Sequence, residues 1–118
     1  MNTVSKISSY FNIEGVFKAE MVASDGNAGA NRSFGPYTIA RNGISIFHGG
    51  GGGNGWAGGG QITTVTFNGV STGISGRNCY AIRECKIGDK WVVSCVGRQS
   101  DSGDPNNAYF QIFVAYMA

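Results

Sequence analysis

The sequence predicts an all-β fold, a small antiparallel β-sandwich formed by one domain that spans residues 1–118. Short segments rich in valine, isoleucine, threonine and aromatic residues recur at the spacing typical of sandwiches and small barrels. No stretch of ten or more residues has a convincing helical period. Asn-Gly and Gly-Asp pairs separate the apolar segments, as turns between strands do. A chain of 118 residues can form one modest core.

The first strand is expected over residues 12–23. Its spacing is ambiguous, because Phe17, Glu20 and Met21 also fit one face of a short helix. Residues 24–31 contain only Ser, Asp, Gly, Asn and Ala, a composition that favours a loop. We therefore expect the first strand to end before this loop.

Three β-hairpins with two-residue turns are expected next. Their turns and strands are Asn42-Gly43 between 37–41 and 44–48, Asn68-Gly69 between 61–67 and 70–72, and Gly88-Asp89 between 79–87 and 91–97. Asn and Gly supply the positive φ values that type I′ and II′ turns require. In the third hairpin this register directs Cys85 and Cys95 to opposite faces of one sheet, too far apart for a disulfide. With Cys79, which lies far along the same strand as Cys85, all three cysteines are expected to be free and mostly buried.

The chain ends in a strand over residues 108–117, after a polar loop over 98–107. Both faces of this strand are largely apolar, so it is central in the sandwich or covered by another subunit. We expect a homo-oligomer, in particular a homotrimer.

A long glycine-rich loop is expected over residues 49–60, where nine of the twelve residues are glycine. Glycine removes side-chain packing and adds backbone entropy, so the segment is expected to be a loop or an extended rod held in place by other parts of the chain. It offers His48, Asn54 and Trp56 as candidate ligand-binding residues. The alternatives are a structural or solvent-facing His48 and a Trp56 that anchors the loop on the sheet.

A second candidate binding loop contains Asp101, Asp104 and Asn106. Together with Asn107 these oxygen-rich side chains are a possible calcium set, but a turn-rich surface loop is the favoured interpretation. We therefore expect no metal and no cofactor.

Catalytic patterns occur but lack their partners, so no enzyme is expected. The segment 48–51 spells an oxyanion-hole sequence and 69–73 spells a nucleophile elbow around Ser71. No histidine follows Ser71 and no helix is expected after it, so a triad has no base. The segment 53–58 fits a dinucleotide fingerprint, but a strand pattern rather than a helix follows it.

Charge and targeting signals limit the partners. A net charge of +2 without a run of Lys or Arg gives no footprint for nucleic acid. The N-terminus has no apolar secretory core, and no segment is long and apolar enough to cross a membrane. An odd number of cysteines with no zinc spacing indicates a chain that folds in a reducing cytoplasm.

The chain resembles the C-terminal tip domains of bacteriophage tail fibres, through its Gly- and Asn-rich composition and the aromatic strand 109–116. Residues 90–116 are also similar to the end of H-type lectin domains, which are trimeric sugar-binding β-sandwiches. These resemblances imply a jelly-roll or H-type-lectin-like sandwich on a virion surface, made without a signal peptide in the bacterial cytoplasm. They imply a receptor-binding protein that recognises a bacterial surface glycan or protein through loops. A structural virion protein that contacts other virion proteins and a free lectin are the alternatives.

Overall fold

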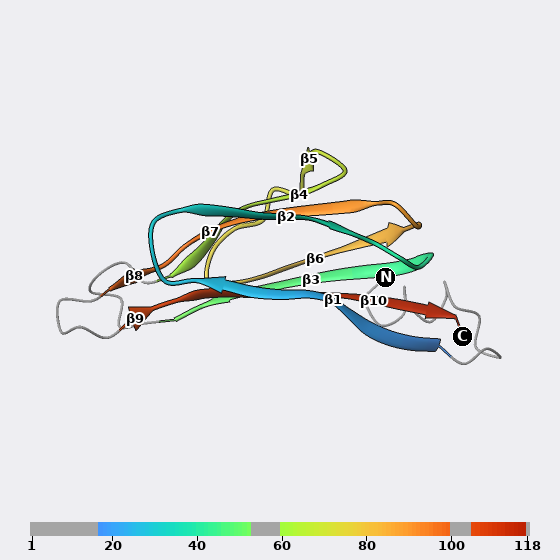
Figure 1. The fold of residues 1–118 in the computed structure, drawn as a ribbon, viewed down its shortest axis with the longest axis horizontal. Helices are drawn as coiled ribbons and strands as arrows, with labels where there is room; N and C mark the ends of the chain where they lie inside the picture. The colour runs from blue at the N-terminus through green and yellow to red at the C-terminus, as the bar shows by residue number, and fades with distance from the viewer. Residues whose placement is uncertain (1–16, 53–59, 100–104, 118) are drawn as a thin grey trace.

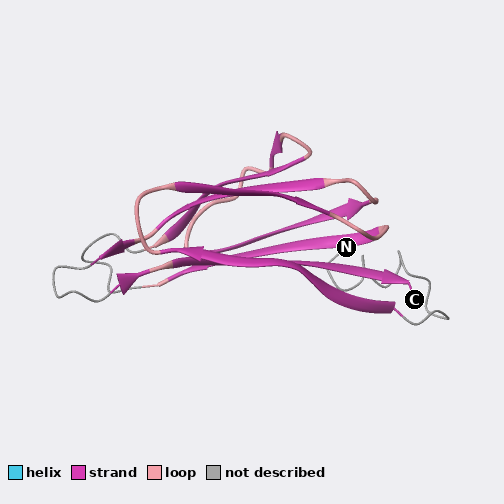
Figure 2. Cartoon of the chain, in the orientation of Figure 1, coloured by secondary structure: helices cyan, strands magenta, loops and turns pink. Residues whose placement is uncertain are grey.

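The computed structural model describes residues 17–52, 60–99 and 105–117, and it confirms the all-β sandwich. Two antiparallel sheets of four strands pack face to face, with no helix in the described residues (Figures 1 and 2). Sheet A has the strand order β1-β10-β3-β6, and sheet B has the order β2-β7-β4-β5. The larger strands are β1 (Phe17–Asn27), β2 (Arg32–Thr38), β3 (Gly43–Gly51), β4 (Gln61–Phe67), β6 (Asn78–Cys85), β7 (Lys90–Val96) and β10 (Ala108–Met117). The two-residue strands are β5 (Val70–Ser71), β8 (Arg98–Gln99) and β9 (Pro105–Asn106).

Aromatic rings from both sheets form the centre of the core. Trp91 of β7 has no exposed surface and packs on Phe47 of β3, with ring centroids 5.9 Å apart, and on Phe67, at 4.8 Å. Its indole N–H donates to the Ser45 hydroxyl at 2.9 Å, and that hydroxyl donates to the Phe113 carbonyl at 2.9 Å. This chain of bonds satisfies the Trp91 indole N–H and the Ser45 hydroxyl, as buried polar groups require.

Two of the three expected hairpins are wrong, because their strands belong to different sheets. β2 pairs with β7 in sheet B whereas β3 pairs with β10 and β6 in sheet A, and β6 and β7 are likewise separated. Gly43 does not have a positive φ; it is a β3 residue at which a Cβ would collide with the Ala115 carbonyl oxygen. The turn at Gly88, where φ is +98°, is centred on Ile87-Gly88 and closed by the Asp89 N–H on the Lys86 carbonyl, at 3.0 Å. Turn residues at these places carry the chain across the sandwich instead of back along one sheet.

The Asn68-Gly69 hairpin is confirmed. Asn68 and Gly69 have φ values of +52° and +79°, as a type I′ turn requires, and they join β4 to β5. Asn68 also contacts Asp89: its amide donates to one Asp89 carboxylate oxygen at 3.1 Å. The other carboxylate oxygen accepts the Lys86 N–H at 2.9 Å, and the Asp89 carbonyl accepts the Ile39 N–H at 2.7 Å. We call this end of the sandwich, where both crossings lie, the crossing end; it is on the right in Figure 1.

The first strand ends later than expected. The described part of β1 continues to Asn27, so residues 24–27 are strand rather than loop, and residues 12–16 lie outside the described residues. Pairing with β10 overrides their turn-type composition, because residues 24–27 register with Gln111 through Ala108 of that strand. β2 occupies residues 32–38 instead of the expected 37–41.

The terminal strand β10 is confirmed as a central strand, between β1 and β3. Phe110, Ile112 and Val114 point into the core and have no exposed surface. On the outer face of sheet A, Tyr109 and Met117 are 51% and 42% exposed. The expected loop over residues 98–107 is partly strand, because β8 and β9 pair there.

The three cysteines are free and buried, as expected, but the register argument for this was wrong. Cys85 is in sheet A and Cys95 is in sheet B, so they do not lie on two faces of one sheet. Burial raises the pKa of each thiol, to about 11 for Cys85 and for Cys95. A thiol that is protonated at neutral pH is a poor nucleophile, which fits a packing role.

Candidate recognition site at the loop end

The expected glycine loop is partly a strand. Gly49, Gly50 and Gly51 belong to β3 and pair with β10 or β6, which contradicts the expectation of a loop from residue 49. Close neighbours explain why glycine is favoured there, most strongly at Gly51, where the neighbour is backbone, and least at Gly50, where it is the exposed Tyr109 ring. A Cβ on Gly49 would lie 2.5 Å from Ile62, one on Gly50 would overlap the Tyr109 ring, and one on Gly51 would overlap the Gly60 carbonyl.

The base of the loop is closed by backbone bonds. Gly60 N–H donates to the Gly52 carbonyl at 3.2 Å, and Gly52 N–H donates to the Asn107 carbonyl at 3.0 Å. A Cβ on Gly60 would in turn overlap the Asn107 backbone. The two loops singled out in the sequence, 49–60 and 98–107, therefore meet at one end of the sandwich. The β1–β2 turn lies there too, since Gly97 N–H donates to the Gly29 carbonyl at 2.8 Å. We call this the loop end, on the left in Figure 1.

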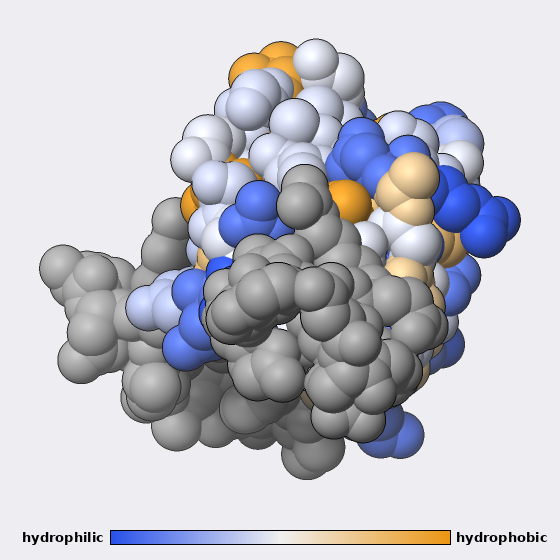
Figure 3. All heavy atoms as spheres, turned by 90° about the vertical axis from the view of Figure 1, so that its left-hand side faces the viewer, coloured by the Kyte–Doolittle hydropathy of each residue, from blue (hydrophilic) through white to orange (hydrophobic). Residues whose placement is uncertain are grey.

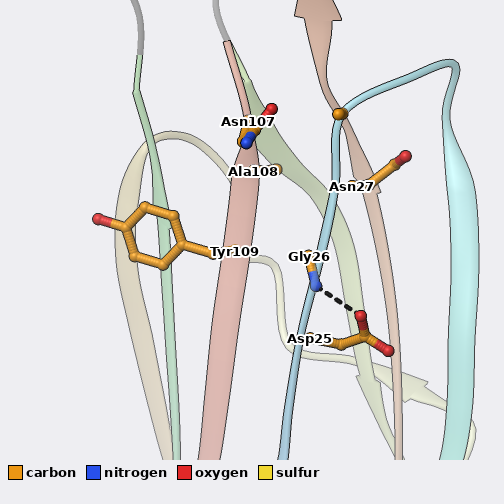
Figure 4. Close-up of a pocket in the computed structure, with 7 residues that line it drawn as sticks. Asp25, Gly26, Asn27, Asn107, Ala108 and Tyr109 are labelled. Atoms are coloured by element: carbon orange, nitrogen blue, oxygen red, sulfur yellow. Dashed lines mark hydrogen bonds between the residues drawn. The ribbon is translucent and has the colours of Figure 1, made fainter. Parts of the chain in front are cut away.

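A shallow cavity of about 390 Å³ lies at the loop end. It is lined by Asp25, Gly26, Asn27, Ala28, Asn107, Ala108 and Tyr109. The side chains that line it do not converge on one point (Figure 4): the Asp25 carboxylate accepts the Gly26 N–H at 2.8 Å, while the Tyr109 ring points away from Asp25, across β3. Asn27 is already engaged, because its amide donates to the Ala30 and Cys95 carbonyls at 2.7 and 2.8 Å. The geometry suits contact with a polar surface more than enclosure of a small molecule.

Two exposed tyrosines flank a polar pair on the adjoining outer face of sheet A. Register places Tyr80 of β6, His48 of β3 and Gln111 of β10 side by side, with Tyr109 in the next row. Tyr80 is 63% exposed and Tyr109 is 51% exposed. Because Gly50 has no side chain, the Tyr109 ring lies against the β3 backbone. We call Tyr80, His48, Gln111 and Tyr109 the tyrosine face.

Of the six residues proposed from the sequence, the structure places two. His48 lies on the tyrosine face, half-buried, and Asn106 belongs to β9 at the loop end. Asn54, Trp56, Asp101 and Asp104 lie outside the described residues. The sequence analysis did not propose Tyr80 and Tyr109 as site residues. Their signal was present, because a tyrosine that alternates with buried positions of a strand faces outward.

The residues of the catalytic patterns lie apart. Ser71 is exposed on β5 in sheet B, where its hydroxyl accepts the Gly73 N–H at 3.1 Å, and His48 is on the outer face of sheet A. Within the described residues, no group of three or more His, Cys, Asp or Glu side chains is placed to hold a metal ion. No helix long and apolar enough for a membrane span occurs in these residues either.

Burial raises the pKa of the Tyr37 phenol, and the nearby Asp25 carboxylate raises it further.

Viewed from the loop end, the visible described residues are mostly hydrophilic or neutral, with scattered hydrophobic side chains (Figure 3). Such a surface favours hydrogen bonding and aromatic stacking over burial of a large apolar group.

Comparison with known proteins assigns no family. No protein-family model matches the chain, and no curated protein matches it significantly. Among solved structures, a chain described under "Bacillus endospore appendages form a novel family of disulfide-linked pili" aligns with 14% sequence identity and a TM-score of 0.42. The alignment covers 87% of this chain and 89% of that one.

Proposed function

We propose that the chain is a non-enzymatic recognition module, a phage-type receptor-binding protein that contacts a bacterial surface glycan or protein through its loop end. The observation that carries the proposal is the meeting of three features at one end of a rigid sandwich. These are the base of the glycine loop, closed by the hydrogen bond from Gly60 to Gly52, the segment around Asn107 beside it, and the exposed Tyr109 ring.

The chemistry of this end supports a polar ligand. Aromatic rings that are exposed, rigid and flanked by amides are suited to stack on a sugar ring while the amides bond to its hydroxyls. Tyr109 is held against the β3 backbone, so little of its conformational freedom is lost on binding. Loops positioned by a rigid scaffold are where binding residues concentrate.

A direct test measures binding of the purified protein to a bacterial glycan array and to whole cells. Tyr109→Ala should weaken binding about 5- to 150-fold, because an aromatic anchor contributes on the order of 1 to 3 kcal/mol. Ile87→Ala is the matched control, since Ile87 is 67% exposed at the crossing end and should bind like the parent. Absence of binding by the parent, or equal loss in both variants, would contradict the proposal.

A structural virion protein is the second candidate, favoured by an apolar row across the outer face of sheet A. The row consists of Met21, Phe113, Ile46 and Ile82, which are neighbours in register from β1 to β6. Met21 is 50% exposed, and the others are half-buried. Presence in purified particles together with failure to bind glycans or cells would favour this candidate. Binding without presence in particles would favour a free lectin.

A further inference from the structure

Strand β6 is an edge strand of sheet A. It pairs with β3 through eight consecutive residue pairs without a bulge, and within the described residues nothing pairs with its other side. Gly51 N–H donates to the Arg77 carbonyl at 2.8 Å, one step beyond the pair Gly50 and Asn78, and this fixes the alternation. In an antiparallel ladder every second pair carries the bonds. The N–H and C=O groups of Asn78, Tyr80, Ile82 and Glu84 therefore point away from β3, to the open edge.

The other edges of the two sheets are blunted. β1 has a register shift between Met21 and Ala23, and its outward Gly26 N–H is taken by the Asp25 carboxylate. β2 is interrupted by Gly35-Pro36, where its register with β7 shifts. Beyond the short β5, the segment after it covers β4, because Thr72 N–H donates to the Val65 carbonyl and Ile62 bridges to Gly76. Bulges, prolines and covering loops are devices that prevent strand addition, and β6 has none of these; its one protective feature is the charged Arg83, on the same face as the buried Ala81 and Cys85.

One outward carbonyl of β6, that of Ile82, already accepts a hydrogen bond from a side chain of the same strand. Arg83 donates from its guanidinium to the outward Ile82 carbonyl at 2.8 Å. The side chain is half-buried, and no salt bridge holds it within the described residues. A strand that pairs with β6 has to displace or share only this one contact, so the edge is open to reversible pairing.

We propose that β6 pairs in antiparallel fashion with β6 of a second copy of this chain, about a two-fold axis at Ile82, so that the two A sheets form one continuous sheet. The proposal holds whether or not the loop end binds a glycan. It gives a dimer, in place of the trimer expected from the sequence.

The sequence of β6 is self-complementary in this register. Ile82 lies opposite Ile82 of the second copy, and the backbone groups of Tyr80, Ile82 and Glu84 all find partners. On the outer face Tyr80 lies opposite Glu84 of the second copy, where its hydroxyl can donate a hydrogen bond to the Glu84 carboxylate. On the inner face, the long Arg83 lies opposite the small Ala81. The apolar row that ends at Ile82 then continues into the row of the second copy.

The same register brings two thiols together. Cys79 of one copy lies opposite Cys85 of the other, as a pair without backbone bonds, in which Cα atoms are about 4.5 Å apart. This separation is within the range that a disulfide spans. Cys95, in sheet B, has no such partner. The three cysteines therefore report on the register and not only on association.

The first experiment is the solution mass by light scattering at tens of micromolar protein. The parent should have twice the chain mass of 12.4 kDa. Ile82→Pro removes an N–H that points to the open edge and should give a monomer. Ala19→Pro is the matched control on the β1 edge, where the Ala19 N–H also points outward, and it should remain dimeric. Ile82→Lys keeps the backbone N–H but places two like charges opposite each other across the two-fold axis, so it should raise the dissociation constant of the dimer about 10-fold or more. This variant tests the interface even if Ile82→Pro does not fold.

The second experiment tests the register with diamide, which accepts the two electrons and two protons that a pair of thiols gives up. After diamide treatment at alkaline pH, the parent should run as a covalent dimer on a non-reducing gel, and Cys95→Ala should do the same. Cys79→Ala and Cys85→Ala should each abolish the covalent link, because every Cys79–Cys85 pair of the dimer then lacks one thiol, and in a mixture of these two variants only the mixed dimers should regain a single link. A monomeric or trimeric parent, a dimer insensitive to Ile82→Pro and Ile82→Lys, or a dimer that does not crosslink through Cys79 and Cys85 would overturn the proposal.

Discussion

Replacement of Gly49 by alanine tests why the glycine run begins inside a strand. The new Cβ would lie 2.5 Å from Ile62 Cγ1 and 3.0 Å from Phe47 Cζ, where carbon atoms in contact are normally about 3.5 to 4.0 Å apart. Ile62 and Phe47 have no exposed surface and are packed in the core, so neither can turn into solvent. Overpacking of this kind costs about 1 to 3 kcal/mol.

The matched control is Gly52→Ala, the same change three residues later. A Cβ on Gly52 meets nothing within 4 Å, so only the effect on the unfolded chain remains, a stabilisation of about 0.4 to 1 kcal/mol. Guanidinium unfolding at one fixed protein concentration measures both variants. The melting temperature should fall by about 4 °C for each kcal/mol of unfolding free energy that is lost, given roughly 2.1 cal/mol/K of unfolding entropy per residue. Equal stability of Gly49→Ala and the parent would refute the packing argument, and an equal loss in Gly52→Ala would show that the loop tolerates no side chain anywhere.

Three further predictions follow from buried groups and from the glycine loop. Ser45→Ala should cost about 1 to 3 kcal/mol in denaturant unfolding, because the Trp91 indole N–H loses its acceptor, whereas Thr63→Ala, which loses an exposed bond to Asn31, should cost under about 1 kcal/mol. Unfolding free energy should fall between about pH 9 and pH 11, because burial raises the folded pKa of Cys95 to about 11 and the thiol of the unfolded chain ionises first. Cys95→Ala should remove roughly 3 kcal/mol of this fall and leave the part due to Cys85, whose pKa is also raised to about 11; an unchanged pH profile would contradict this assignment. Trp56→Ala should lower ligand or cell binding by about 1 to 3 kcal/mol with little change in melting temperature, while a large stability loss would make Trp56 a structural anchor.

The sequence predicts strands better than it predicts which strands are neighbours. β-Branched and aromatic residues between turn pairs identified β4, β6, β7 and β10, because strand composition is a local property of the sequence. Asn42-Gly43 and Gly88-Asp89 misled, since a turn that crosses between sheets uses the same residue types as a hairpin. At Gly43 the decisive contact is the Ala115 carbonyl, more than seventy residues away, and no local pattern reports it.

The candidate site was predicted only in part for a similar reason. Glycine density identified the loop, but the neighbours of Gly49, Gly50 and Gly51 come from β4, β10 and Gly60, so their strand conformation depends on tertiary contacts. The meeting of the two loops likewise depends on Gly52, which directly follows β3, and Asn107, which directly precedes β10, the strand that pairs with β3 in sheet A.

The two ends of the sandwich should differ in how well they tolerate insertions, and the Asp89 contacts are the reason. At the crossing end one carboxylate and its own carbonyl join the β4–β5 turn, the β6–β7 crossing and the β2–β3 crossing, so an inserted residue there would separate three segments at once. At the loop end one backbone hydrogen bond from Gly60 to Gly52 closes the base of the glycine loop, and a longer or different sequence between these residues leaves it in place. A library of new binding sequences should therefore be grafted between Gly52 and Gly60, with the crossing end kept as the fixed base of a display scaffold.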